Sequence, residues 1–178
     1  MRQTLVFTAA ALMTTAGCGM FGGKKEGPAP ATTTARAEMR SATGQRLGDL
    51  ALTQTSNGLL ILGELNGLPP GTHGFHIHTV GKCDPTFDAA GGHFNPTQRQ
   101  HGIRNPNGNH GGDLTNLNVP ESGTLRVESW TKDVTLTGNN RVLDADGSAL
   151  MIHALADDYT TDPSGASGAR IACGVITP

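Results

Sequence analysis

The sequence predicts an all-β domain, an antiparallel sandwich or flattened barrel of short strands. No long segment has a sustained 3.6-residue apolar period, which argues against a helical bundle. Glycine (25) and proline (10) are frequent, whereas hydrophobic residues make up only 36% of the chain. Turn signals recur at short intervals, as expected for a loop-rich β protein. A chain of 178 residues is long enough for one domain with its own core.

Short strands separated by turn residues account for most of the chain. An Asn-Gly pair at residues 57–58 favours a tight hairpin between the second and third strands. A proline pair at residues 69–70 ends the third strand, and a glycine at 123 separates the fifth from the sixth. The eight expected strands cover residues 37–42, 48–55, 59–65, 74–79, 113–119, 124–130, 149–153 and 170–176.

Two connections are too long for a simple set of hairpins. Residues 80–112 and 154–169 have neither strand nor helix patterning. Loops of this length in a compact domain are usually functional or disordered. The first contains one cysteine and three histidines, and a bound metal would supply the ordering free energy that a missing core cannot. We therefore expect functional loops, of which at least the first is ordered by metal.

The N-terminal residues are expected to direct export. Residues 1–17 read as a signal peptide, with Arg2 before an apolar run too short to span a bilayer. The sequence Thr-Ala-Gly-Cys at residues 15–18 resembles a bacterial lipobox and predicts a lipid on Cys18; the alternative is an ordinary secretory peptide cut nearby. Residues 18–36 read as a flexible tether and residues 37–178 as the folded domain. The expected location is the periplasm or cell envelope, with a membrane anchor only through Cys18.

Charge and cysteine content limit the possible partners and the compartment. Thirteen basic and fifteen acidic residues give a net charge of −2, and no basic run follows the leader, so nucleic-acid binding has no electrostatic support. The three cysteines are Cys18, Cys83 and Cys173. If Cys18 carries lipid, an oxidising compartment would pair the other two. The alternative is two unpaired buried thiols.

Six of the seven histidines form a spaced series with one aspartate. Imidazole suits copper and zinc alike, and a carboxylate adds an oxygen donor that zinc accepts readily. These seven candidate ligands can fill two four-coordinate sites only if one ligand serves both metals. The series therefore predicts a two-metal site. Its members are His76, His78, His93, His101, His110, Asp113 and His153.

The spacing of the series divides it into two groups. Residues two apart on a strand share a face, so His76 and His78 can converge on one metal. His153 ends another expected strand and can reach the same centre. His110 and Asp113 lie where the first long loop meets a strand, so one turn can bring both to a second metal.

His93 lies between the two groups in sequence and is the natural shared ligand. An imidazole that bridges two metals must lose both ring protons, which two flanking cations make feasible. The alternative is that the six histidines are separately satisfied by ordinary hydrogen bonds.

These residues resemble those of the copper/zinc superoxide dismutases. The resemblance covers roughly residues 37–178 and implies an eight-stranded Greek-key β-barrel with two long functional loops, in an exported, lipoprotein-type bacterial form. It is carried by GFHIH at 74–78, GGHFNP at 91–96, His101-Gly102, NHGGDL at 109–114 and GARIACGVI at 168–176.

The resemblance implies one copper and one zinc per subunit and a role for each ligand. The implied copper ligands are His76, His78, His93 and His153. The implied zinc ligands are His93, His101, His110 and Asp113, with His93 bridging the metals.

Four further positions receive roles from the resemblance. Cys83 and Cys173 match the family's disulfide. Arg170 matches an arginine beside the copper channel, where a guanidinium can dock a small anion. Asp157 matches a carboxylate that links a copper histidine to a zinc histidine and fixes their orientation. Asp158 is the competing candidate for that role.

The seventh histidine, His73, resembles a structural residue below the copper site. The loop at residues 154–169 holds three aspartates and no lysine, so an attractive field for an anion must come from elsewhere. Lys82, Arg99 and Arg104 are possible sources. We expect Arg170 to supply most of the local positive potential.

The activity that the resemblance implies is superoxide dismutation in the cell envelope. Two superoxide anions and two protons give O2 and H2O2 through alternate reduction and oxidation of copper, with Arg170 and His93 as catalytic residues. Zinc has no redox chemistry and would hold the loop. No segment marks a dimer surface, so the sequence makes no prediction of oligomeric state.

The sequence leaves two alternative functions open. One is a copper-binding or copper-handling protein on the same fold, without turnover. The other is a zinc hydrolase, which needs a general base close to the metal. The only glutamates of the body lie away from the ligand loop, at positions 38, 64, 121 and 128.

Overall fold

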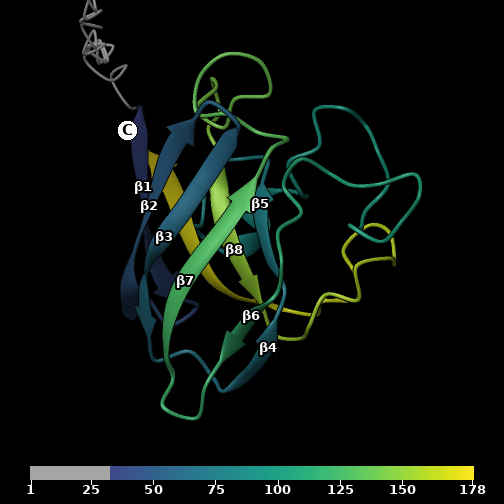
Figure 1. The fold of residues 1–178 in the computed structure, drawn as a ribbon. Helices are drawn as coiled ribbons and strands as arrows, with labels where there is room; N and C mark the ends of the chain where they lie inside the picture. Colours follow the sequence, from purple (N-terminus) through teal and green to yellow (C-terminus); the bar gives the residue numbers. More distant parts are fainter. Residues whose placement is uncertain (1–32) are drawn as a thin grey trace, which may run out of the picture. The chain divides into compact units, whose positions relative to one another are not determined.

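The computed structural model describes residues 33–178, which form an all-β unit of antiparallel strands (Figure 1). The predicted fold class is therefore confirmed. The predictions for the signal peptide, for Cys18 and for most of the tether lie outside the described residues. Within residues 33–178 we find no helix with the length and apolar character that a bilayer crossing requires.

The described residues contain nine strands and one short 3-10 helix. In chain order they are β1 (Thr34–Ser41), β2 (Arg46–Thr55), β3 (Gly58–Asn66), β4 (Gly71–His73), β5 (Phe75–His78), η1 (Phe87–Ala90), β6 (Leu117–Val119), β7 (Thr124–Thr131), β8 (Ala149–His153) and β9 (Arg170–Thr177).

Seven strands form one curled antiparallel sheet in the order β5-β8-β9-β1-β2-β3-β7, and β4 pairs with β6 in a small second sheet. β1, β2 and β3 are consecutive hairpin neighbours. The β2–β3 hairpin is the one that the Asn-Gly turn predicted. In contrast, β9 returns from the far end of the chain to lie beside β1. Such a long return connection is the Greek-key kind of arrangement.

Alternation along the strands separates the core from the metal-binding face. In β5, Phe75 and Ile77 belong to the main hydrophobic core, so the intervening His76 and His78 lie on the opposite face. β8 is buried on both faces. Its Leu150 and Ile152 enter the main core, whereas Met151 packs in a smaller cluster beneath the first long loop.

The fourth expected strand, residues 74–79, is found as β5. Gly74 separates it from β4, which the sequence did not predict, and the two strands pair with different partners. Gly74 donates its N–H to Leu155 O and accepts from His153 N, so the second long loop lies against it. A Cβ at this position would lie 2.8 Å from the Cβ of Ser167. This close approach requires glycine.

Two other strand boundaries differ from the prediction by three or more residues. Only Leu117–Val119 of the expected strand 113–119 joins a ladder, because Asp113 before it is hydrogen-bonded to the loop. β1 begins at Thr34, three residues before the expected start. The long loop 80–112 also contains the 3-10 helix η1. A helix of only four residues is too short to show an apolar period in the sequence.

Candidate metal centre

Four histidines converge on the face of β5 that points away from the core. β5 and β8 are paired, with His76 opposite Met151 and His78 opposite Ala149. His153 ends β8, and His93 pairs with His78 across an isolated bridge. One ring nitrogen from each of His76, His78, His93 and His153 lies within 4.8 Å of the others, and all four residues are buried.

Hydrogen bonds on the outer ring nitrogens determine which nitrogen faces the centre. His78 Nδ1 donates to Gly91 O at 2.8 Å and His153 Nδ1 donates to Gly168 O at 3.1 Å. Their Nε2 atoms are left facing each other, 3.4 Å apart. His76 Nδ1 and His93 Nε2 are buried without any hydrogen-bond partner among the described residues.

Such orphaned nitrogens are costly unless something binds them. Four inward-facing imidazole nitrogens form a donor set that suits copper. The residues present therefore fit a copper ion.

A second set forms around one oxygen of Asp113. Oδ1 lies 2.9 Å from His93 Nδ1, 3.0 Å from His101 Nδ1 and 3.3 Å from His110 Nδ1. The other oxygen, Oδ2, accepts the backbone N–H groups of Gly102 and His110. Four donors around zinc at bonds of about 2.0 Å would be spaced roughly 3.3 Å apart. Three imidazoles and one carboxylate at this spacing fit zinc.

Proximity alone would also admit His76 to the second set in place of His110. We place His110 there because its Nδ1 lies 3.4 Å from His93 Nδ1, whereas His76 Nε2 is bound to Asp157. His93 belongs to both sets, with Nδ1 facing Asp113 and Nε2 facing the other three histidines. The structure thus brings together all seven side chains of the predicted series.

Asp157 joins the two sets from outside. Its Oδ2 accepts from His76 Nε2 at 2.8 Å and its Oδ1 from His101 Nε2 at 3.0 Å. Asn116 holds its backbone at two points: Nδ2 donates to Asp157 O and Oδ1 accepts from Asp157 N, both at 2.9 Å. Gly165, at φ +65°, passes so close that a Cβ would collide with the carboxylate.

Asp158, the competing candidate, is exposed. Its carboxylate accepts from the backbone and side chains of Thr160 and Thr161, so it caps a turn.

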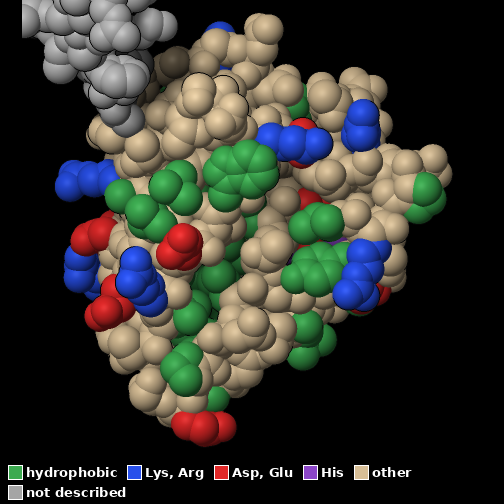
Figure 2. All heavy atoms as spheres, in the orientation of Figure 1, with side chains coloured by type: hydrophobic (Ala, Val, Ile, Leu, Met, Phe, Trp, Pro, Cys, Tyr) green, Lys and Arg blue, Asp and Glu red, His purple; other side chains and the backbone are tan. Residues whose placement is uncertain are grey.

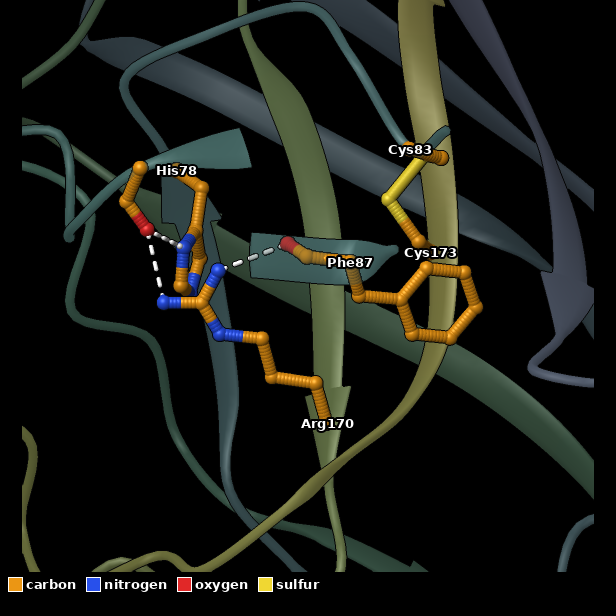
Figure 3. Close-up of a disulfide and its surroundings, with 6 residues drawn as sticks. His78, Cys83, Phe87, Arg170 and Cys173 are labelled. Atoms are coloured by element: carbon orange, nitrogen blue, oxygen red, sulfur yellow. Dashed lines mark hydrogen bonds between the residues drawn. A yellow bond between two sulfur atoms is a disulfide. The ribbon is translucent and has the colours of Figure 1, made fainter. Parts of the chain in front are cut away.

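Arg170 lies beside His78, and the first long loop fixes its guanidinium (Figure 3). Nη1 donates to Phe87 O at 2.6 Å and Nη2 to Gly91 O at 2.7 Å. The same Gly91 oxygen accepts from His78 Nδ1. The disulfide Cys83–Cys173, with a Cα–Cα distance of 5.9 Å, ties this loop to β9. The pairing of the two cysteines is therefore confirmed.

The comparisons with known proteins agree with this geometry. Residues 46–176 match the profile of the family described as copper/zinc superoxide dismutase. The chain is 44% identical over 144 residues to Superoxide dismutase [Cu-Zn] 1 of Aquifex aeolicus, covering 79% of this chain and 85% of that protein. It is 40% identical over 147 residues to Superoxide dismutase [Cu-Zn] of Caulobacter vibrioides, covering 80% and 84%.

The chain belongs to the copper/zinc superoxide dismutase family.

A similar solved structure is that of a SOD-like protein from Bacillus subtilis, with a TM-score of 0.75 and 42% identity over 79% of this chain and 96% of that chain. The clock protein EA4 is also similar, with a TM-score of 0.71 and 33% identity over 83% and 96%. These likenesses agree with the expected Greek-key β-barrel.

In this member of the dismutase family, burial keeps the copper-set imidazoles neutral when no metal is bound. Burial lowers the pKa of His76 to about 3, of His78 to about 2 and of His153 to about 4. Burial also lowers the pKa of His93. A neutral imidazole has a free lone pair, so these rings are ready to bind metal at neutral pH.

In the second set of this dismutase-family chain, the electrostatics of His101 are opposite to those of the strand histidines. Burial opposes charge on His101, but its hydrogen bonds to Asp113 and Asp157 prevail and raise its pKa to about 9. Burial likewise opposes ionisation of the two carboxyls, yet the surrounding histidines hold the pKa of Asp113 and of Asp157 well below the usual range. Without metal, His101 is ion-paired with these two carboxylates.

Two of the three expected sources of a steering field, Arg99 and Arg104, have other contacts. Arg99 donates to Gly108 O, and the Arg104 guanidinium lies 5.6 Å from the centre of the Tyr159 ring. Lys82 is exposed. Asp88 Oδ1 lies 3.8 Å from Arg170 Nε, so an exposed carboxylate partly offsets the one cation that these contacts place beside the copper set.

Three contacts of the site were not anticipated from sequence. Asn116 and the Tyr159 hydroxyl, which accepts from Asn116 N, support Asp157. Asp162 accepts the His101 N–H at 2.5 Å and lies 3.8 Å from His110 Nε2. No sequence signal distinguishes these residues from ordinary loop residues.

The seventh histidine, His73, is also buried, with Nδ1 at 2.8 Å from His153 O and Nε2 at 3.0 Å from Pro69 O. It therefore contacts the backbone that carries His153 and joins neither ligand set.

Proposed function

We propose that this chain is a superoxide dismutase that uses copper and zinc. The observation that carries the proposal is the junction of two complete ligand sets at one imidazole, with an anchored guanidinium beside the set that suits copper. The proposed copper ligands are His76, His78, His93 and His153. The proposed zinc ligands are His93, His101, His110 and Asp113.

Copper, when bound, supplies the alternating one-electron oxidation and reduction that turns two superoxide anions and two protons into O2 and H2O2. The chain supplies the binding of the anion. Arg170 places a cation near His78, where its fixed donors can dock a small anion. Because the carbonyls of Phe87 and Gly91 hold the guanidinium in place, little reorganisation is needed when the anion arrives.

His93 is the residue best placed to handle a proton. Its Nε2 faces the strand histidines and its Nδ1 is held at Asp113, so the ring keeps its orientation while Nε2 gains or loses a proton. A proton on Nε2 would stand at the reacting centre, where the product peroxide needs one. Asp157 is hydrogen-bonded to both His76 and His101 and so orients the two rings together. Displacement of a ring in one set is therefore opposed by its link to the other set.

We further propose that the protein acts in the bacterial cell envelope. Residues 1–17 serve as signal peptide, Cys18 carries a lipid, and residues 18–33 form a tether. The enzyme domain begins at residue 34 and not at the expected residue 37, because β1 starts there. The disulfide supports an oxidising compartment. Mass spectrometry of the purified mature protein should show a lipid on an N-terminal Cys18; an unmodified thiol or a different cleavage site would contradict the anchor.

Reconstitution tests the activity. Protein loaded with copper and zinc should consume superoxide far faster than the metal-free protein. The alternative, a copper-binding protein without turnover, predicts tight copper binding with equal superoxide consumption in the loaded and metal-free forms. Loading zinc alone is the control, because zinc has no redox chemistry.

A further inference from the structure

The outer face of the main sheet is divided into rows of side chains that run across the strands. The register places Thr34, Thr53, Leu60 and Trp130 in one row across β1, β2, β3 and β7. Two residues further along each strand, the next row is Arg36, Ala51, Leu62 and Glu128. We call Ala51, Leu60, Leu62 and Trp130 the apolar band.

The next row has a different character. It consists of Glu38, Asp49, Glu64 and Arg126, all charged and exposed. In the space-filling view, hydrophobic side chains gather over the upper parts of β3 and β7, and charged ones lie below them (Figure 2). Polarity on this face thus changes along the strands, from apolar at the end where β1 begins to charged in the middle.

Trp130 is the most prominent member of the band. Three large hydrophobic side chains are about half exposed among the described residues. Ile103 and Leu155 belong to the long loops, whereas Trp130, at 51% exposure, stands on a regular strand. Leu60 and Leu62 beside it are partly exposed. A half-exposed tryptophan among leucines suggests a surface that something covers.

The proposed anchor indicates what covers it. About fifteen residues separate Cys18 from Thr34, and a flexible chain of that length spans roughly 20 Å on average. The chain enters the sheet at Thr34, in the same row as Trp130. A lipid on Cys18 would therefore keep this end of the sheet close to a bilayer. At the high effective concentration that a short tether gives, a small patch can hold one orientation.

We propose that the apolar band is the face that contacts the membrane in the lipid-anchored protein. This proposal rests on the lipidation of Cys18 proposed above. Tryptophan favours the headgroup region of a bilayer, where its ring is apolar and its N–H stays hydrated. Successive rows are about 7 Å apart, so insertion to a depth of about 5–10 Å takes in the apolar band.

The charges near the band agree with this orientation. The exposed Lys132 follows Trp130 at the end of β7 and can reach lipid phosphates. The acidic residues are concentrated in the third row, which stays outside the bilayer. Glu128, in the second row, lies at the edge of the bilayer.

The chain contains a single tryptophan, which allows a direct test. The full lipidated protein is reconstituted on vesicles of phosphatidylethanolamine and phosphatidylglycerol, with and without lipids that carry a spin-label quencher. We expect Trp130 emission to shift to shorter wavelength and to be quenched severalfold more by the lipid-borne quencher than by acrylamide. The Cys18→Ser protein should show the reverse, because it lacks the anchor.

A matched control moves the tryptophan to the other end of the same strand face. The doubly substituted protein Trp130→Phe, Thr124→Trp has its indole about 20 Å away along β7 and should escape the lipid-borne quencher. Anchored protein whose Trp130 remains as open to acrylamide as in Cys18→Ser would overturn the proposed face but leave the anchor intact.

Two other outcomes would also overturn the proposal. Protein that carries no lipid and does not float with vesicles would remove the anchor together with the face. In the second outcome, Trp130 is shielded from both quenchers while the particle size grows with protein concentration. That result would show that a second copy of the chain, and not the membrane, covers the apolar band.

Discussion

The two halves of the metal centre are held in different ways. His76, His78 and His153, the strand-borne set, stand on β5 and β8, where ladder register and core residues fix them. The loop-borne set, His101, His110 and Asp113, lies on an irregular segment that depends on side-chain hydrogen bonds and a disulfide. The strand-borne imidazoles are neutral without metal, whereas His101 of the loop-borne set is ion-paired with Asp113 and Asp157. Regular structure positions ligands by itself, while a loop needs charge, cross-links and metal.

Removing the metals should give the largest effect and should separate the two sets. Structural zinc contributes about 10–16 kcal/mol in small zinc domains. In the metal-free protein we expect amide hydrogen exchange to increase by orders of magnitude at residues 93–113 but little in β1–β3. Equal loss of protection in both regions would show that the loop is no more dependent on metal than the sheet.

Replacing both Cys83 and Cys173 with serine should give the second largest effect. The bridge closes a segment with a separation of 90 residues, worth about 4–5 kcal/mol on loop entropy. We expect a lower urea midpoint for unfolding, and weaker anion binding because the loop that holds Arg170 is released. The reduced wild-type protein is the control and should behave alike.

Arg170 connects the two regions, because it arises from β9 while the loop carbonyls hold its guanidinium. Arg170→Ala should reduce dismutation about 100-fold, within the range seen when one fixed donor is removed from an anion site. It should also weaken the dependence of the rate on ionic strength. Arg170→Lys keeps the charge and should retain part of both properties. An unchanged rate at all salt concentrations would contradict the role.

Asp157→Asn should lower zinc affinity by about 10–100-fold, as measured by competition with a chelator. An amide has only one accepting atom, so it cannot accept hydrogen bonds from both His76 and His101. One of the two hydrogen bonds that link the ligand sets is therefore lost. Asp158→Asn is the matched control, because Asp158 contacts neither set. Equal zinc affinity in Asp157→Asn and Asp158→Asn would contradict the proposal that Asp157 supports zinc binding.

The pH dependence of the metal-free protein should sharpen the contrast further. Folding lowers the pKa of His76, His78 and His153, so stability falls as the pH drops below about 6.5 towards those values. Each should cost about 1.5 kcal/mol between pH 6.5 and pH 5. His101 has the opposite sign: its contribution is complete below about 6.5 and is lost as the pH rises through about 9.

Urea unfolding of the metal-free protein from pH 5 to pH 10 measures both the loss of stability at low pH and the loss at high pH. The metal-loaded protein should be much less sensitive to pH, because bound nitrogens cannot be protonated. Metal-free protein with a flat profile would contradict the contrast between the two sets.

The sequence anticipated the parts of the centre that local pattern controls. Alternation of Phe75, His76, Ile77 and His78 already assigns one pair to the core and the other to the opposite face. The Asn-Gly turn gives the β2–β3 hairpin. The histidine spacing selected all seven side chains that converge.

What the sequence did not reveal depends on the path of the loops. Asn116 and Asp157 are 41 residues apart, and only the folded loop brings the amide to that backbone. The interruption at Gly74 likewise arises from contact with Leu155 and Ser167 in a distant loop. Carbonyl groups such as those of Phe87 and Gly91 have no side-chain signature at all.

The carbonyl oxygen of Gly91 accepts hydrogen bonds from two groups, the imidazole of His78 and the guanidinium of Arg170. Any displacement of that one peptide unit would move the guanidinium that is proposed to dock the anion together with one imidazole of the set that fits copper. Redesigning the entrance for a larger or differently charged anion would therefore shift a metal-binding ring as well, unless a second acceptor were first built for one of the two groups.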